Sequence, residues 1–569
     1  MRSGLTGVGL CLLAAVGLAL TSCKVSEDSD ADPPEIERTR ELLSPTQHLV
    51  RISTVLRGKR PSLSELRQVH EEPSALGGIV DQYLQSPEFG ETLRELHNES
   101  LQVRVAAGIY PAGFPARGAL AGFSSQEVNV AITEAPLRLI QWVVEHERPY
   151  SEIVTAPYTV ANDIVATAWG ITLDRASGGW HTGQYDDGRP HAGILSDSML
   201  FTRHSTTYAN SNRGRANAVA RSLLCYDFLA REISVDASIN LADPKEVANA
   251  VRVNAACASC HQTLDPLASF FGAFHPVFLP SDIQSYPFPH YLPALNSAFT
   301  STESAYFGHK GQGLAFLGSM IAADPRFSLC AAQRFYAYLN HVNLRDVPHA
   351  RAAELQTLFV RSKLNAKALT RAIVLSDDFR HADSDETAEA PIHGVRKVRP
   401  SELSRLVEDL TAFRWTANLD VDIGSGNIGR IDLLSDSLFG FEVLLGGIDS
   451  VNVTLPAHSM NASASLVLRG IASRAAPYVV QRDLDNPDVE QRKLLGAVSA
   501  TESAEARIRA QLCDLHLRLY GEFLEPADPA IDGSYALFQD ALTAAAGDVR
   551  RAWSTTLFAL LQDVRLAHF

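Results

Sequence analysis

Apolar residues recur every three to four positions along most of this chain, a spacing that predicts amphipathic helices rather than strands. Pro45–Leu56 has a proline at a helix start, and Ser62–Glu65 has the S-x-x-E spacing of a capping box. Ala135–Glu147 repeats its apolar residues on one face, and Asp243–Glu246 opens another helix with an aspartate cap followed by proline. Val451–Leu455 is one short strand candidate. We therefore expect a mainly α fold.

Residues 382–400 interrupt this periodicity with acidic residues, small residues and proline, and we interpret them as a linker between two helical halves. The first half is expected to contain an N-terminal helical region at 45–185 and a second region at 186–381. The second half, residues 401–569, is expected to form a helical domain whose role the sequence leaves open.

The N-terminal residues resemble a bacterial lipoprotein signal. Residues 1–22 contain a basic residue and then the apolar run Leu5–Leu20, which at 16 residues is shorter than the about 20 needed to span a membrane. Leu20–Cys23 resembles a lipobox, so we expect Cys23 to carry lipid; an ordinary signal peptide cut elsewhere is the alternative. Residues 23–44 are acidic and are expected to form a stalk. These features predict a protein of the bacterial cell envelope, anchored to a membrane by lipid and facing the periplasm or the cell surface.

The charge of the chain bears on its partners. There are 50 Lys and Arg residues against 65 Asp and Glu, a formal net charge of −15. Such a chain repels phosphate backbones and has no dense basic block, so we expect no nucleic-acid partner. The composition, 46% hydrophobic and 20% charged, is ordinary for a globular protein, and the length allows about two to four domains.

The sequence Cys257-Ala258-Ser259-Cys260-His261 is the C-x-x-C-H attachment motif of c-type haem. Two thiols three positions apart can form thioethers with the two vinyl groups of one haem, and the adjacent histidine then ligates the iron. A redox disulfide is one alternative, but it is expected in a thioredoxin-like βαβ context. A zinc site is another, but only His275 follows as a ligand within twenty residues. The sequence thus predicts one covalent haem c, and a haem c domain at 186–381.

Aspartate is favoured as a helix N-cap and proline at the first helical position, so we expect a second helix to begin at Asp265 and Pro266. Apolar residues on both sides of the motif are candidates for the wall of a haem crevice, or for plain core. They are Val247, Val251, Leu264, Leu267, Phe270, Phe271 and Phe274.

The sixth iron ligand and the partners of the haem propionates stay open. Five residues are candidate sixth ligands: Met199, Met320, His191, His204 and His275. Three arginines are candidate propionate partners or, alternatively, part of a solvated helix start: Arg203, Arg213 and Arg215.

Cys225 and Cys330 both lie in expected helices of the haem half, and we predict a disulfide between them, with two separate buried thiols as the alternative. Cys513 would then remain as a small buried apolar residue.

The segment 256–271 resembles the cysteine–histidine segment of the planctomycete cytochrome c-like proteins, an exported family with the haem-c motif whose domains are largely of unknown function. The resemblance covers roughly 135–381. The family usually has Gly-Phe after D-P-[LI], where this chain has Ala268-Ser269, which puts the packing of that turn in doubt. The resemblance to the family implies haem binding more securely than it implies any particular reaction. Other matching segments follow the family's order: 158–171, 191–201, 212–225, 327–339 and 369–380.

Two further patterns near residue 424 do not predict a site. Gly424–Gly429 spells G-x-G-x-x-G, but the surrounding residues predict a polar glycine loop rather than the strand-turn-helix that a dinucleotide needs. Asn418, Asp420 and Asp422 suggest calcium, but Ile423 stands where an EF-hand loop needs glycine.

Together these features predict a lipid-anchored mono-haem c-type cytochrome that transfers single electrons to or from a redox partner protein in the envelope. The acidic surface would favour a basic partner. Two other functions stay open: a haem-dependent oxidoreductase with an open sixth iron position, and a binding or scaffold lipoprotein in which haem is structural.

Overall fold

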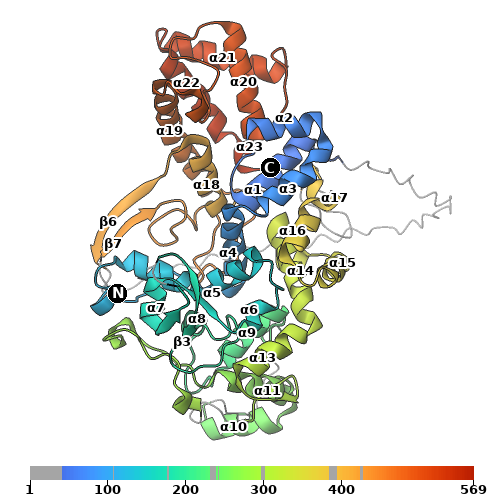
Figure 1. The fold of residues 1–569 in the computed structure, drawn as a ribbon, viewed down its shortest axis with the longest axis vertical. Helices are drawn as coiled ribbons and strands as arrows, with labels where there is room; N and C mark the ends of the chain where they lie inside the picture. The colour runs from blue at the N-terminus through green and yellow to red at the C-terminus, as the bar shows by residue number, and fades with distance from the viewer. Residues whose placement is uncertain are drawn as a thin grey trace, which may run out of the picture. The chain divides into compact units, whose positions relative to one another are not determined.

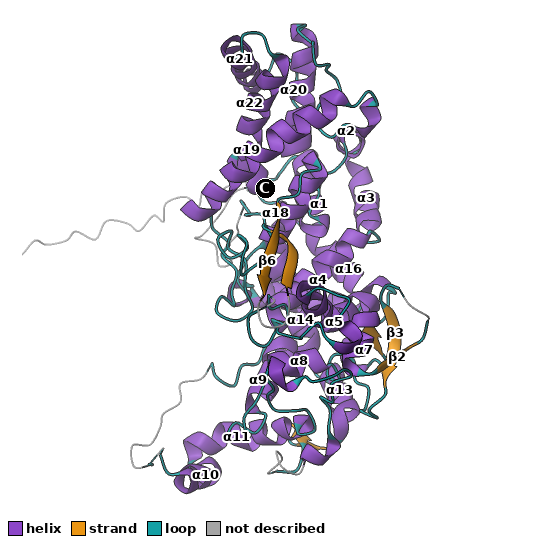
Figure 2. Cartoon of the chain, turned by 90° about the vertical axis from the view of Figure 1, so that its left-hand side faces the viewer, coloured by secondary structure: helices purple, strands orange, loops and turns teal. Residues whose placement is uncertain are grey.

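The structure is a computed structural model, which describes residues 41–569 except 107, 176–177, 231–238, 241, 297–301, 383–393 and 423–426. The predicted signal peptide, Cys23, nearly all of the stalk and most of the predicted linker lie outside the described residues. The described chain is mainly helical, as Figures 1 and 2 show, which confirms the predicted fold class.

Helices make up most of the chain before residue 381 (Figure 1). Those before residue 170 are α1 (Pro45–Arg57), α2 (Leu63–Glu71), α3 (Leu76–Tyr83), α4 (Pro87–Leu101), α5 (Ser125–Glu145), α6 (Glu152–Thr155) and α7 (Asp163–Trp169). Those that follow are α8 (Ser198–Arg203), α9 (Arg213–Leu224), α10 (Pro244–Val253), α11 (Ala255–Ala268), α13 (Gly313–Ala323), α14 (Pro325–Asn340), α15 (His349–Arg361), α16 (Ala366–Val374) and α17 (Asp377–Arg380).

The later part of the chain is also helical. It contains α18 (Pro400–Thr411), α19 (Ala462–Asp485), α20 (Glu505–Tyr520), α21 (Pro529–Ala544), α22 (Val549–Gln562) and α23 (Val564–Ala567).

The strands are short and antiparallel (Figure 2). In the three-stranded sheet, β3 (His181–Tyr185) lies between β1 (Thr159–Ala161) and β2 (Ile171–Leu173). Two further pairs are β4 (Ala305–Tyr306) with β5 (His309–Lys310), and β6 (Thr416–Asp422) with β7 (Asn427–Asp432). The G-x-G-x-x-G pattern therefore falls across a hairpin, β6–β7, and is not followed by a helix.

Local side-chain chemistry explains where several helices begin. Ser62 accepts from the backbone N–H of Glu65, whose carboxylate accepts from Ser62 N in return, so the predicted capping box is confirmed. Asp243 caps α10 by accepting from Lys245 N at 2.8 Å, and Pro244 fills the first helical position, as predicted.

The predicted strand at Val451–Leu455 is wrong: these residues form a loop. The Asp449 carboxylate accepts from the backbone N–H groups of Val451, Asn452 and Val453, at 2.8, 2.7 and 2.8 Å. Those donors are therefore committed to a local turn and cannot pair with a neighbouring strand.

Buried apolar side chains form two large cores and a smaller one. The first core draws on residues from Leu49 to Phe379 together with Leu517, and the second on residues from Val398 to Ala567. The smaller core, with members from Phe114 to Phe288, packs around the three-stranded sheet. The first core includes side chains on both sides of residue 185, and the proposed domain boundaries stay predictions.

The buried Arg60 side chain joins residues that belong to different parts of the sequence. It donates to the carbonyl oxygens of Leu519 and Leu566, each at 2.9 Å. Thr46 Oγ1 likewise donates to Gly521 O at 2.7 Å. These bonds fasten the first helices of the chain to the last ones.

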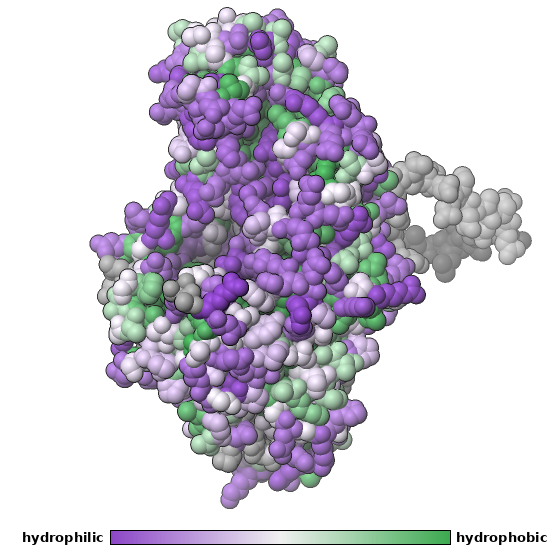
Figure 3. Space-filling view, viewed as in Figure 1, coloured by the Kyte–Doolittle hydropathy of each residue, from purple (hydrophilic) through white to green (hydrophobic). Residues whose placement is uncertain are grey.

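The face shown in Figure 3 is mostly hydrophilic, with apolar residues scattered in small patches. Such a surface suits a chain with a net charge of −15. None of the helices in the described ranges is long and apolar enough to cross a membrane.

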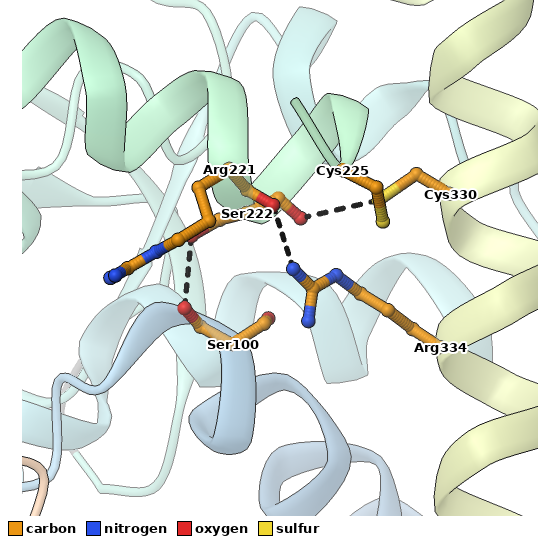
Figure 4. Close-up of a disulfide and its surroundings, with 6 residues drawn as sticks. All are labelled: Ser100, Arg221, Ser222, Cys225, Cys330 and Arg334. Carbon is orange, nitrogen blue, oxygen red and sulfur yellow. Dashed lines mark hydrogen bonds between the residues drawn. A yellow bond between two sulfur atoms is a disulfide. The ribbon is translucent and has the colours of Figure 1, made fainter. Parts of the chain in front are cut away.

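Cys225 and Cys330 are joined in a disulfide (Figure 4). Cys225 caps the C-terminal end of α9, and Cys330 lies within α14. The bridge closes a loop of sequence separation 105 that contains the C-x-x-C-H motif. Both sulfurs are therefore held between two helices of the first core.

The double variant Cys225→Ala/Cys330→Ala should lose about 2–5 kcal/mol of unfolding free energy, because the closed loop restricts the unfolded chain. Urea unfolding of the oxidised protein measures this loss. Cys513→Ala, which removes an unpaired cysteine, is the control. A double variant as stable as that control would contradict the prediction.

Candidate haem attachment site

The C-x-x-C-H motif lies in the first turns of α11. Asn254 begins this helix: its Oδ1 accepts from the backbone N–H of Ala256 at 3.0 Å and of Cys257 at 3.3 Å. Such a cap satisfies donors that a helix start leaves unpaired. α10 ends at Val253 and packs against α11 (Figure 1), so the two helices meet directly before the motif.

The predicted helix start at Asp265 and Pro266 is wrong. α11 continues through both residues to Ala268, with Pro266 inside the helix. Because Pro266 stands two residues before the helix end, it removes one backbone hydrogen bond without dividing the helix. The Asp265 carboxylate instead contacts side chains, as described below.

Both thiols of the motif are unpaired. Cys257 and Cys260 are partly buried, and they lie three positions apart on one face of α11. In the same chain, Cys225 and Cys330 form a disulfide. The motif thus presents two thiols and one imidazole from adjacent turns, the donor set that covalent haem attachment uses.

The ring of His261 is held by a hydrogen bond to Asp265. Its Nδ1 lies 2.9 Å from Asp265 Oδ1, one turn further along α11. Arg213, the first residue of α9, donates to both oxygens of that carboxylate, from Nε at 2.6 Å and from Nη2 at 2.8 Å. A bidentate arginine–carboxylate pair is geometrically specific, so α9 fixes the carboxylate that fixes the ring.

This pair also determines the tautomer of His261. Burial alone would raise the pKa of the Asp265 carboxyl, but the hydrogen bonds from Arg213 and His261 outweigh it and lower that pKa to about 2. An ionised carboxylate only accepts hydrogen bonds, so Nδ1 of His261 carries the proton. In the neutral ring, Nε2 then has the free lone pair that a metal requires.

The apolar residues near the motif divide into two groups. Leu264, Leu267, Phe270, Phe271 and Phe274 are members of the first core. On α10, Val247 and Val251 are only partly buried, and Val253 is 70% exposed. One side of the motif is therefore closed by core, while α10 presents apolar surface that a large apolar group can cover.

The five candidate sixth ligands lie in different surroundings. Met199 is wholly buried in the smaller core, and Met320 packs half-buried against the first core. His204 Nε2 is 3.0 Å from Leu101 O, and burial beside Arg203 lowers its pKa to about 3.

The other two candidates, His191 and His275, each have a buried Nδ1 without a hydrogen-bond partner within the described ranges. Burial lowers the pKa of both rings. The ring of His191 lies tilted against that of Tyr185, and the ring of His275 lies near those of Phe278 and Phe288. The structure assigns none of the five to the iron, and the sixth ligand stays a prediction.

Two of the three candidate propionate partners are committed elsewhere. Arg215 is wholly buried and makes six hydrogen bonds, five to carbonyl oxygens and one to Asn212. Arg203 donates to Gln102 O at 2.8 Å and to Ser450 O. The third, Arg213, pairs with Asp265.

A second polar cluster lines a cavity of about 790 Å³ between α4, α5 and α18. Glu134 forms ion pairs with Arg94 at 2.7 Å and with Arg104, and Arg104 also pairs with Glu95 at 2.6 Å. These charges compensate each other. The cluster lies apart from the motif.

In the part of the chain that the structure describes, no group of three or more His, Cys, Asp or Glu side chains is arranged to hold a bare metal ion. The donor set at α11 instead fits a porphyrin: two thiols for covalent bonds and one imidazole nitrogen for the iron.

Comparison with known families bears on this segment. Residues 191–277 match the model of PSCyt3, described as a protein of unknown function (DUF1588). This is a planctomycete cytochrome-like domain family. The PSCyt3 match includes the motif, Asp265 and Arg213, and leaves the rest of the chain unassigned. No curated protein and no solved structure matches the chain.

The contact of Asp265 with His261 and Arg213 was not predicted. One signal was present in the sequence: His261 and Asp265 are four positions apart, the spacing at which side chains meet on a helix. Arg213 stands 52 residues away, and only the folded chain brings it to the carboxylate.

A double-mutant cycle on Arg213→Gln and Asp265→Asn should give a coupling energy of about 1–2 kcal/mol, since the pair is bidentate and mostly buried. Urea unfolding of the two single variants and the double variant measures it. The exposed pair Arg371–Asp81 serves as control and should couple by about 0.5 kcal/mol or less. Additive effects at Arg213 and Asp265 would contradict the geometry.

Proposed function

We propose that this chain is a lipid-anchored mono-haem c-type cytochrome that transfers single electrons in the bacterial cell envelope. Cys257 and Cys260 would hold the haem through thioethers, and His261 would ligate its iron. Cys23 would carry the lipid, and a redox partner protein, basic where it meets this acidic chain, would exchange the electron.

The observation that carries the proposal is the state of the three donor groups on α11. Both thiols are unpaired in a chain that forms a disulfide elsewhere. The His261 ring is fixed through Nδ1, so that Nε2 has its lone pair for a metal. The match of residues 191–277 to a cytochrome-like domain family supports the same proposal.

When bound, a haem supplies reversible exchange of one electron between ferric and ferrous iron. The chain's own residues would position it and control its surroundings. Asp265 orients the His261 ring and increases the basicity of Nε2, and Arg213 keeps that carboxylate ionised. The buried leucine and phenylalanine residues that follow the motif exclude water from one side.

Protein made in a bacterial host with haem-ligation machinery should carry the mass of one haem after denaturation, because thioether bonds survive unfolding. Cys257→Ser/Cys260→Ser should lose that mass, whereas Cys513→Ser should keep it. Intact-mass spectrometry makes the measurement. Wild-type protein without added mass would overturn the proposal.

Spectroscopy of the same material separates electron transfer from the other two functions. A low-spin optical and EPR spectrum with a reversible potential supports electron transfer. A high-spin iron that binds cyanide or reduces peroxide would instead indicate an oxidoreductase with an open sixth position. Bound haem without reversible redox chemistry or turnover would indicate a structural cofactor.

Asp265→Asn should raise the midpoint potential of the haem protein. The carboxylate makes the imidazole a stronger donor and so favours ferric iron; the neutral amide does not. A tenfold change in the ferric preference corresponds to about 59 mV for one electron, which is the size we expect. Optical redox titration measures the shift.

Glu246→Gln is the matched control, because it removes the same charge from α10 without contacting His261. Its potential should stay near the wild-type value. Equal shifts in both variants would show that only net charge matters, and would contradict a positioning role for Asp265.

A further inference from the structure

At the C-terminal end of α9, away from the haem motif, lies a cavity of about 640 Å³ whose charges are not balanced. Its lining includes three arginines: Arg221 from α9, Arg334 from α14, and Arg345 from the segment after α14. One carboxylate lines it, Glu99, and this group is paired with Arg399 at 2.9 Å. The cavity wall therefore carries excess positive charge.

Arg334 comes from the middle of α14. Its Nη2 donates to Arg221 O at 2.7 Å, as Figure 4 shows, while its Nε is buried and has no hydrogen-bond partner within the described ranges. No ion pair with a described carboxylate is present at Arg334 or at Arg221. Burial lowers the pKa of Arg334 to about 10, which reflects the cost of holding this charge away from water.

Arg215, on the same helix as Arg221, is a buried arginine whose surroundings differ from those of Arg334. Arg215 makes six hydrogen bonds and uses all three of its guanidinium nitrogens. Buried charges are normally paired or hydrogen-bonded in this way. Arg334 instead stands in the wall of a cavity together with Arg221, and neither forms an ion pair with a described carboxylate, so the two guanidinium groups are suited to an external anion.

The rest of the lining indicates which kind of anion fits. Tyr338 also lines the cavity. A planar carboxylate matches a guanidinium better than a point charge does. Apolar side chains complete the wall: Leu96, Ala337, Val342, Leu344 and Leu455.

We propose that this cavity binds an organic carboxylate with an apolar body, whose carboxylate accepts hydrogen bonds from the Arg334 guanidinium group. Arg221 and Arg345 raise the positive potential around the cavity, and the apolar body packs against the leucine and valine side chains. This site is independent of the haem motif, which contributes no residue to it.

Isothermal titration calorimetry with octanoate on the full chain tests the proposal. Octanoate should bind and octylamine should not. The Arg334→Gln variant should bind octanoate with an affinity at least tenfold lower than that of the wild type. Arg326→Gln is the matched control: it removes the same charge from α14 at a residue that pairs with Asp324 and does not line the cavity, and it should leave the affinity unchanged.

Failure of octanoate to bind at millimolar concentration, or equal binding by wild type and Arg334→Gln, would overturn the proposal. If Arg334→Gln does not yield folded protein, Arg221→Gln decides instead, because the Arg221 carbonyl that Arg334 uses is retained. A measurable loss of affinity in that variant supports the site, and an unchanged affinity overturns it.

Discussion

The ion pair between Arg213 and Asp265 is the interaction on which the geometry of the candidate haem site depends. It fixes the carboxylate, the carboxylate fixes the protonated Nδ1 of His261, and Nε2 is left with its lone pair. The Asp265 carboxylate and the His261 ring cannot rotate independently, because Arg213 donates to both carboxylate oxygens. The orientation of one imidazole on α11 is therefore set by the first residue of a different helix.

That helix, α9, is itself held at both ends. At its start, Arg215 donates to carbonyl oxygens of Phe201, His204 and the segment 274–276, which ties α9 to the loops around it. At its other end, Cys225 is bonded to Cys330 on α14. A helix fixed in this way can position a charged side chain with little loss of conformational entropy, which strengthens the pairing of Arg213 with Asp265.

The sequence was sufficient wherever the determinant of structure was local, as at the capping box of Ser62 and the cap of α10 at Asp243. The prediction from the sequence was wrong where the groups that suggested a local structure form hydrogen bonds with a different partner in the folded chain. Asp265 and Pro266 have the types of a helix start, but the Asp265 carboxylate pairs with Arg213, 52 residues away. The β-branched residues of Val451–Leu455 suggest a strand. In the structure, the backbone N–H groups of Val451 and Val453 donate to the Asp449 carboxylate instead of to a neighbouring strand. The C-x-x-C-H motif is visible in the local sequence alone; the groups that orient His261 are not.

Two arginines of α9 differ in how their positive charge is compensated. Arg213 and Arg221 stand eight residues apart on α9, which separates them by about 12 Å along the helix. Arg213 is neutralised by a carboxylate of this chain, and its role is to hold a neighbour in place. Arg221 and Arg334 meet no such carboxylate among the described residues, and they stand at a cavity instead of a packed core. Two guanidinium groups that share one cavity without an ion pair to a described carboxylate are the physical reason to expect an anion there.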